Sequence, residues 1–227
     1  MRIGIIAAMK DEMKLILDRI ENLKEETYMN IHYFYGDINN NEVVLCESGC
    51  GKVNAAMATT LLINNFEVEL IINTGIAGGI GGAGFKDVVI ANGLSYHDFD
   101  LKIFGYEYGV VPGFPKVLPV NPEMIMKVKS TLNKLKIDYK EGVILSGDQF
   151  VSTLTKLENV TVSNALAVEM EGCAVGHVAT KAGVDFIVLR YISDIVGAKS
   201  QNDNYLKFEK EMATRSAKIC IMLVENL

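Results

Sequence analysis

The feature that most constrains the fold is the segment 165–196, which is apolar almost throughout but contains four charged residues: Glu169, Glu171, Arg190 and Asp194. Isolated charges are costly to bury, so they are normally paired, hydrogen-bonded or shifted in pKa. One interpretation is a structural ion-pair cluster in which Arg190 pairs with these acids. Three acids around one arginine leave negative charge unpaired, which favours a second interpretation: a site where one carboxylate stays protonated and another stays ionised.

Within this segment, the pattern predicts the end of a strand at 166–168, a helix of small residues over 172–182 and a buried strand over 185–189. The glycine that follows the helix is its expected stop. Arg190 and Asp194 are expected at the exit of the second strand. Ligands of open α/β sheets bind beyond the carboxyl ends of strands, so the two strand exits predict a polar pocket.

The rest of the chain alternates between apolar runs of strand type and amphipathic runs of helix type. The expected elements are, in order, strand 2–8, helix 9–20, strands 31–35 and 42–47, helix 53–64, strands 70–74 and 87–91, helix 121–135, strand 141–145 and helix 205–225, with a polar loop over 200–205. The 227 residues show no internal repeat, linker or low-complexity segment. A chain of this length forms one sizeable core, so we expect a single α/β domain over residues 1–227.

Two glycine-rich loops are candidates for phosphate binding. Residues 48–52 lack the spacing of a P-loop, so tight packing between strand and helix explains them at least as well as an anion site. Gly79, Gly81 and Gly84 match GxGxxG, but a strand is expected next, whereas a dinucleotide site needs a helix whose N-terminus receives the pyrophosphate. The glycines instead predict sharp turns and a close approach of the backbone to a ligand.

Composition narrows the possible partners. The net charge of −6, without a basic stripe, argues against nucleic acid. No apolar run reaches the roughly 18 uncharged residues of a membrane span, and the chain opens directly on a strand, so we expect a cytoplasmic protein that does not bind membranes. The cysteines lack metal-ligand spacing, and His97 has no second histidine nearby, which predicts a hydrogen-bonding or surface role for His97 and no metal site.

Short runs along the chain resemble, in order, the segments of one enzyme family: IGIIAAMKDE, SGCGKVNAA, NTGIAGG, YHDFD, FGYEYG, SGDQF, AVEMEG and LRYISD. The chain is similar to the bacterial methylthioadenosine/S-adenosylhomocysteine nucleosidases, within the superfamily of nucleoside phosphorylases and nucleosidases. This resemblance implies an α/β, nucleoside phosphorylase-like fold with a central twisted mixed sheet flanked by helices, and a homodimer. It also implies hydrolysis of the N-glycosidic bond of 5′-substituted adenosines, which releases adenine and a thioribose for methionine salvage, with no cofactor.

The resemblance assigns catalytic roles to three residues. Asp194 matches the acid that delivers a proton to N7 of the purine, and Glu12 matches the carboxylate that orients the attacking water, helped by Arg190. Adenine is a poor leaving group, and general acid catalysis typically accelerates such a step by about 10² to 10⁴. The pairing of a protonated acid with an ionised base follows inverting glycoside hydrolysis by analogy. Glu12 also has a simpler explanation, because acids are favoured in the first turn of a helix.

The resemblance also implies a set of substrate contacts. Glu171 matches the acid that accepts hydrogen bonds from the ribose hydroxyls, with Met170 packed against the sugar. Phe150 matches the ring stacked on adenine, and Val151 supplies backbone hydrogen bonds to the base. The other expected substrate-binding residues are Met9, Ile76, Glu169 and Tyr205. The residues expected from the neighbouring subunit are Leu101, Phe104 and Pro112.

Two residues depart from the family pattern. Ile76 replaces the usual serine or threonine after NTG, so a hydroxyl near the ribose is lost, which either argues against phosphorolysis or alters substrate choice. Tyr191 replaces a small residue in R-x-x-SD and would narrow the pocket if it pointed inward. The alternatives that stay open are a nucleosidase for another 5′-substituted adenosine (5′-deoxyadenosine or aminodeoxyfutalosine), a purine nucleoside phosphorylase, and a nucleoside-binding module without turnover.

Overall fold

The computed structural model describes the backbone of residues 1–227 and the side chains of residues 1–10 and 12–227. The strands are β1 (Arg2–Ala7), β2 (Glu21–Tyr28), β3 (Ile31–Ile38), β4 (Asn41–Glu47), β5 (Leu70–Gly79), β6 (Val88–Tyr96), β7 (Leu118–Pro119), β8 (Tyr139–Ser146), β9 (Ala165–Glu169) and β10 (Asp185–Ile195). The α-helices are α1 (Lys10–Leu17), α2 (Lys52–Phe66), α3 (Pro122–Lys134), α4 (Gly172–Ala182) and α5 (Gln201–Asn226), with short 3₁₀ helices at Lys102–Phe104 and Leu154–Leu157. The predicted α/β class is confirmed.

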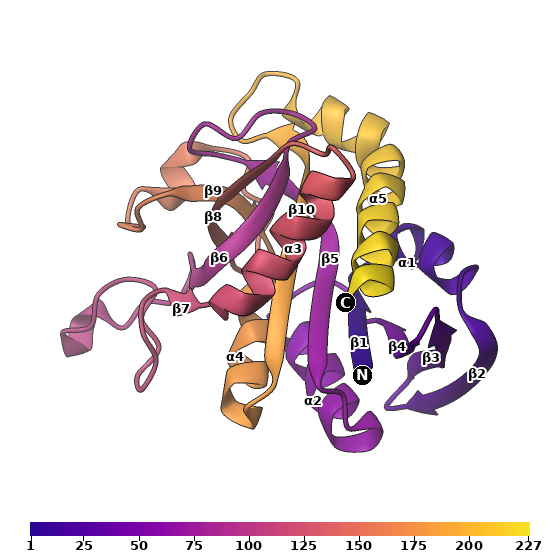
Figure 1. Cartoon of the computed structure of the whole chain (residues 1–227). Helices are drawn as coiled ribbons and strands as arrows, with labels where there is room; N and C mark the ends of the chain where they lie inside the picture. Colours follow the sequence, from indigo (N-terminus) through magenta and orange to yellow (C-terminus); the bar gives the residue numbers. More distant parts are fainter.

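The strands form one twisted mixed sheet (Figure 1). Their order is β10-β6-β8-β9-β5-β1-β4-β3-β2, and β7 pairs with β6. Because β10 also pairs with β5, the strands from β10 to β5 close into a ring, and β1, β4, β3 and β2 continue outward from it. The pairs of β5 with β1 and with β10 are parallel, whereas its pair with β9 is antiparallel. This mixture is the central sheet that the family resemblance implies.

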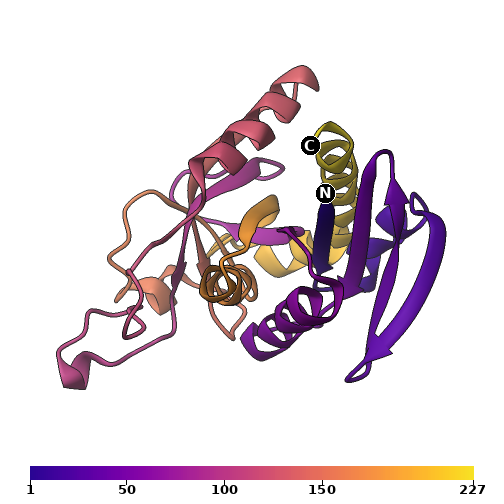
Figure 2. The same ribbon diagram turned by 60° about the horizontal axis from the view of Figure 1, so that its bottom comes forward.

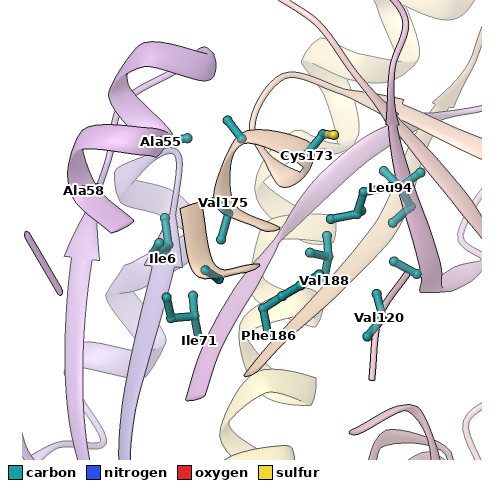
Figure 3. Close-up of a cluster of buried hydrophobic side chains, with 14 of the residues drawn as sticks. Ile6, Ala55, Ala58, Ile71, Leu94, Val120, Cys173, Val175, Phe186 and Val188 are labelled. Carbon is teal, nitrogen blue, oxygen red and sulfur yellow. The ribbon is translucent and has the colours of Figure 1, made fainter. Parts of the chain in front are cut away.

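Helices cover the two faces of the sheet (Figures 1 and 2). On one face α2 and α4 pack side by side, and Figure 3 shows their small residues, such as Ala55 and Val175, against strand residues such as Ile71 and Val188. On the other face α1, α3 and α5 pack through a second cluster that includes Ile16. Full burial of a large aliphatic side chain contributes about 1.5–3 kcal/mol, so these two clusters hold the helices against the sheet.

Strand β2 is an element that the sequence pattern did not predict. Its sequence ENLKEETY is rich in charged residues, and most of its side chains are exposed to solvent. It pairs only with β3, at the outer edge of the sheet. Edge strands commonly carry charges that discourage pairing with other chains, and such charges hide the alternation by which a strand is recognised.

Two boundaries near the predicted pocket were wrong. Arg190 and Asp194 lie inside β10 and not beyond its end, because β10 continues to pair with β5 as far as Gly79. The polar loop expected over 200–205 is helical instead, since α5 begins at Gln201. The polar side chains near the pocket therefore belong to a strand and a helix, which are more rigid than the loops that were expected there.

The glycine-rich run 75–84, which begins inside β5, behaves partly as predicted. Its first residues remain in the strand, and Gly81 and Gly82 then turn the chain with φ of 56° and 93°. The next element is strand β6 and not a helix, as the rejection of a dinucleotide site required. His97, after β6, contradicts its prediction: it is fully buried, and neither ring nitrogen has a hydrogen-bond partner among the described residues. Burial lowers the pKa of His97, which favours the neutral ring.

Candidate active site

A cavity lies where β1, β5, β9 and β10 approach the start of α5. The predicted residues that line it are Met9, Glu12, Ile76, Phe150, Val151, Glu169, Met170, Glu171, Asp194 and Tyr205. They come from distant parts of the chain, and the fold brings them to one place. Apolar walls with a few convergent polar groups are typical of small-molecule sites.

Glu12 is held by backbone N–H groups on two sides. Its Oε2 accepts from the N–H of Ala8 at 2.8 Å and of Met9 at 3.1 Å, and its Oε1 accepts from the N–H of Ile76 at 3.2 Å. The bond from Met9 belongs to the capping box at the start of α1, so Glu12 also has a structural role in its helix. The third bond ties the carboxylate to β5 and turns it into the cavity.

The protein environment of Glu12 favours the protonated form of its carboxyl more than aqueous solution would. Burial raises the pKa of Glu12, and the positive charge of Arg190 and the three backbone N–H groups oppose that rise. Gly75 makes the close approach possible, because a Cβ at that position would lie 2.6 Å from Glu12 Oε1. A carboxylate with a raised pKa is suited to act as a base near neutral pH.

Glu171 is the second carboxylate of the cavity. Its Oε1 accepts from the backbone N–H of Gly51 at 2.8 Å, at the N-terminus of α2. Burial and the neighbouring charge of Glu169 raise the pKa of Glu171 to about 7. Near neutral pH this group therefore exchanges readily between a form that accepts hydrogen bonds and a form that donates one.

The N-terminus of α2 also holds the loop that follows β8. The backbone N–H of Lys52 donates to Asp148 Oδ1 at 2.7 Å, next to the hydrogen bond from Gly51 to Glu171. The Lys52 ammonium donates to both oxygens of Asp98 at 2.7 Å, and Asp98 accepts from the N–H of Asp148 at 2.8 Å. One helix end thus fixes the separation between Glu171 and the loop that carries the ring expected to stack on adenine.

Arg190 forms a buried network around Asn73. Its Nη1 donates to the carbonyl oxygens of Asn73 and Leu189, and its Nη2 donates to Asn73 Oδ1 and to Glu169 Oε2, both at 2.5 Å. Arg190 does not line the cavity, in contrast to Glu169. Its contribution to Glu12 is the electrostatic effect of its charge.

Both oxygens of the Glu169 carboxylate accept hydrogen bonds from other groups of the protein. Its Oε2 also accepts from the backbone N–H groups of Glu171 and Gly172 at 3.0 and 2.8 Å, where α4 begins. Its Oε1 accepts from the Ser146 hydroxyl, which in turn accepts from the N–H of Cys173. The carboxylate therefore joins β8, β9, β10 and α4 at the base of the cavity.

Asp194 reaches the cavity through an irregularity in β10. The pairing with β5 shifts between Ile192 and Asp194, so Ser193 is an extra residue in the strand. Bulges of this kind redirect side chains and are common beside active sites. The Ser193 hydroxyl donates to Asp194 Oδ1 at 2.6 Å, and the amide of Gln201 donates to Oδ2 at 2.9 Å.

Aromatic and sulfur-containing side chains form the other wall. The rings of Phe150 and Tyr205 meet edge to face, with centroids 5.4 Å apart. The Tyr205 hydroxyl lies 4.0 Å from Met9 Sδ, so the N-terminal part of α5 closes over the end of β1. Phe150 is 43% exposed, which leaves a ring face free to stack on a flat heterocycle.

The two departures from the family pattern have different consequences. Ile76 keeps its backbone bond to Glu12, so the missing hydroxyl leaves the carboxylate held in place. Its side chain shares a strand face with Thr74, whose hydroxyl contacts Ser216 of α5. Tyr191 does not line the cavity; it packs on the face covered by α1, α3 and α5, beside Arg215. Tyr191 therefore does not narrow the pocket.

Three predicted residues lie away from the cavity of their own chain. Leu101, Phe104 and Pro112 belong to the segment between β6 and β7, which projects from the body of the protein in Figures 1 and 2. Phe104 is 73% exposed there.

Other lining residues were missed by the sequence reasoning. They include Cys50, Gln149, Ser193 and Gln201. Gln201 had a detectable signal, because it lies four residues before Tyr205 and therefore on the same helical face. The polar composition of residues 200–205 hides that signal, because it is typical of a loop.

The described side chains contain no group of three or more His, Cys, Asp or Glu residues placed to hold a metal ion. In the part of the chain that the structure describes, no helix has the length and apolar character needed to cross a membrane.

Residues 2–225 match the phosphorylase superfamily. The chain is 36% identical to the 5′-methylthioadenosine/S-adenosylhomocysteine nucleosidase of Desulfotalea psychrophila, over 100% of this chain and 98% of that relative. Among solved structures, it is similar to the S-adenosylhomocysteine nucleosidase of Streptococcus pyogenes in complex with 5-methylthiotubericidin, with a TM-score of 0.94, 39% identity, and coverage of 100% and 97% of the two chains.

A futalosine hydrolase of Helicobacter pylori is also similar, with a TM-score of 0.93 and 33% identity over 100% of this chain and 98% of that one. The likeness to these proteins extends over whole chains and includes the elements that build the cavity. The chain therefore belongs to the 5′-methylthioadenosine/S-adenosylhomocysteine nucleosidase family of the phosphorylase superfamily.

Proposed function

We propose that this protein hydrolyses the N-glycosidic bond of 5′-methylthioadenosine and S-adenosylhomocysteine and releases adenine and the corresponding thioribose. The observation that carries this proposal is the convergence of Glu12, Glu171 and Asp194 on one cavity with an aromatic wall. Three carboxyl groups around an apolar cleft suit a substrate with a basic purine nitrogen, a sugar diol and a developing positive charge.

Asp194 acts as the general acid in this proposal. Cleavage leaves electrons on the purine, and a proton delivered to N7 converts a poor leaving group into neutral adenine. The bulge at Ser193 accompanies a carboxyl that lines the cavity, and the Gln201 amide bridges this carboxyl to the carbonyl oxygen of Val151, the residue after Phe150. A purine stacked on the Phe150 ring would present its N7 edge to Asp194.

Glu12 activates the water, and Glu171 holds the sugar. Glu12 is fixed by three N–H groups, so it can accept a proton from water without changing its position. Its negative charge also stabilises the oxocarbenium-like sugar of the transition state. Glu171 accepts hydrogen bonds from the ribose hydroxyls, and Arg190 is a positioning residue that acts through Glu169 and through its field at Glu12.

Hydrolysis is favoured over phosphorolysis by the lining of the cavity. Among its described side chains, none is basic, whereas three are carboxylic acids besides Asp194. A phosphate ion needs cationic or N–H donors, and these carboxylates would repel it. Other 5′-substituted adenosines, such as 5′-deoxyadenosine or aminodeoxyfutalosine, are the second candidate substrates, because the resemblance to a futalosine hydrolase extends over the whole chain.

A second copy of the chain completes the site in this proposal. The projecting segment between β6 and β7 carries exposed apolar side chains, with Ile103 88% and Phe104 73% exposed. Exposed apolar side chains that cluster on one segment are typical of interfaces. Leu101, Phe104 and Pro112 would then cover the 5′-substituent in the partner's cavity.

The test is adenine release from both substrates by the wild type and by Asp194→Asn. The wild type should release adenine from each, and the variant should lose at least about a hundredfold in kcat while its circular dichroism is unchanged. Normal turnover by Asp194→Asn would refute the acid assignment.

A further inference from the structure

The side chain of Gln201 fills part of the cavity assigned to the purine. Its Nε2 lies 2.9 Å from the carbonyl oxygen of Val151 and 2.9 Å from Asp194 Oδ2. Its Oε1 accepts from the backbone N–H of Gly197 at 2.9 Å, and the residue is 4% exposed. Both the NH₂ group and the oxygen of the Gln201 amide therefore have hydrogen-bond partners within the protein.

The partners of Gln201 define which end of the amide is the donor. Val151 O and the Asp194 carboxylate are acceptors, and Gly197 N–H is a donor. A flipped amide would point its oxygen at two acceptors and its NH₂ group at a donor. The NH₂ group must therefore face Val151 and Asp194.

An adenine ring would compete for the same two acceptors. The N7 atom and the 6-amino group of adenine lie on one edge of the ring. If Asp194 protonates N7, as the proposed function on which this inference rests requires, the 6-amino group lies beside the same carboxylate. The 6-amino group and the Gln201 amide are both planar NH₂ donors, so only one of them can occupy the position between Val151 O and Asp194.

The small volume of the cavity agrees with a Gln201 side chain that occupies part of the purine position. Its volume is about 90 Å³, whereas ligand sites usually measure about 300–1,000 Å³. A nucleoside therefore needs a side chain to move. Gln201 is the first residue of α5 and shares a helical face with Tyr205, so it lies on the element that closes over the cavity.

We propose that Gln201 is an internal ligand that takes the place of the purine 6-amino group in the empty site and is displaced when adenine or its nucleosides bind. The apparent association constant for adenine equals its intrinsic value multiplied by the fraction of molecules in which the amide is displaced, so a small displaced fraction weakens binding. Return of the amide to Val151 and Asp194 helps to expel adenine after the reaction. The effect depends on the 6-amino group, because a purine with hydrogen at position 6 leaves the place of the amide free.

The test compares the affinities for adenine and for unsubstituted purine, measured by calorimetry. The proteins are the wild type, Gln201→Ala, Gln201→Ser and the control Asn202→Ala, which changes an exposed neighbour in the same turn of α5. Both Gln201 variants should bind adenine more tightly than the wild type, by about tenfold for a displaced population of about one tenth in the wild type. Their affinity for unsubstituted purine should change by less than about twofold, and the control should match the wild type.

The proposal is overturned if the Gln201 variants bind adenine with unchanged or weaker affinity, or if both ligands gain equally. The hydrolysis assay separates this result from the proposed function. Tighter adenine binding in the variants, with no adenine released from methylthioadenosine by the wild type, would refute the reaction and leave the role of Gln201 standing. Release by the wild type, with equal adenine affinity in all four proteins, would refute only the role of Gln201.

Discussion

Arg190 pairs with Glu169 and with no other acid of the cavity: Nη2 lies 2.5 Å from Oε2, and the two side chains are 2% and 3% exposed. The structural interpretation of these charges is therefore correct for this pair. The remaining acids, Glu12, Glu171 and Asp194, are held by backbone N–H groups, an amide or a hydroxyl. This division leaves three carboxyl groups free for chemistry.

Removal of the charge of Glu169 should destabilise the fold strongly. Glu169→Gln leaves the buried guanidinium of Arg190 without a counter-charge, and the expected loss in free energy of unfolding is about 3 kcal/mol. Urea denaturation measures it. The matched control is Glu225→Gln, which breaks the more exposed pair with Arg19 and should cost less than about 1 kcal/mol. Equal losses in the two variants would contradict the account.

Stability should fall as the pH rises through the mildly acidic range. The pKa of Glu171 is raised from 4.5 to about 7 in the folded protein, so between these values the unfolded chain has released a proton that the folded protein still holds. The free energy of unfolding decreases with pH wherever the unfolded state binds fewer protons. The raised pKa of Glu12 contributes with the same sign.

The measurement is a set of denaturation curves across this pH window. Glu171→Gln removes one titrating group, so its free energy of unfolding should depend less steeply on pH than that of the wild type. A slope that is unchanged in Glu171→Gln would show that this carboxyl does not titrate as described.

The parts of this molecule that could be predicted are those with a local cause. Helix α4 ends at Gly183 with φ of 71°, as its glycine stop indicates, and the buried strands follow from short apolar runs. The motifs also identify most of the cavity residues. Strand β2 was missed because its only partner is β3 and its charged side chains face solvent on both sides.

The contacts of the site could not be predicted in the same way. The bond between Gln201 and Val151 joins residues fifty positions apart. Arg190 pairs with Glu169, although the sequence pattern offers Glu171 and Asp194 as partners equally well. Such choices depend on the register of β10 and on its bulge at Ser193, which no local pattern encodes. The burial of His97 is a further tertiary effect.

The projecting segment should be needed for assembly and for substrate affinity. Phe104→Glu places a charge on an exposed apolar side chain, and it should convert the proposed dimer to a monomer in light scattering and raise KM for methylthioadenosine by about tenfold or more. The control is Met126→Glu, which changes a side chain that is 61% exposed on α3, away from this segment. A dimer with normal KM in Phe104→Glu would exclude this segment from the interface.

The most direct test of the central claim is the fate of the attacking oxygen. The wild type is given methylthioadenosine in ¹⁸O-labelled water, with and without inorganic phosphate, and the sugar product is analysed by mass spectrometry. The account predicts free methylthioribose, without phosphate at C1 and with labelled oxygen there from the first turnovers, and a rate that phosphate does not change, because Glu12 activates water in a cavity lined by acids. A sugar 1-phosphate, or a reaction that requires phosphate, would contradict it.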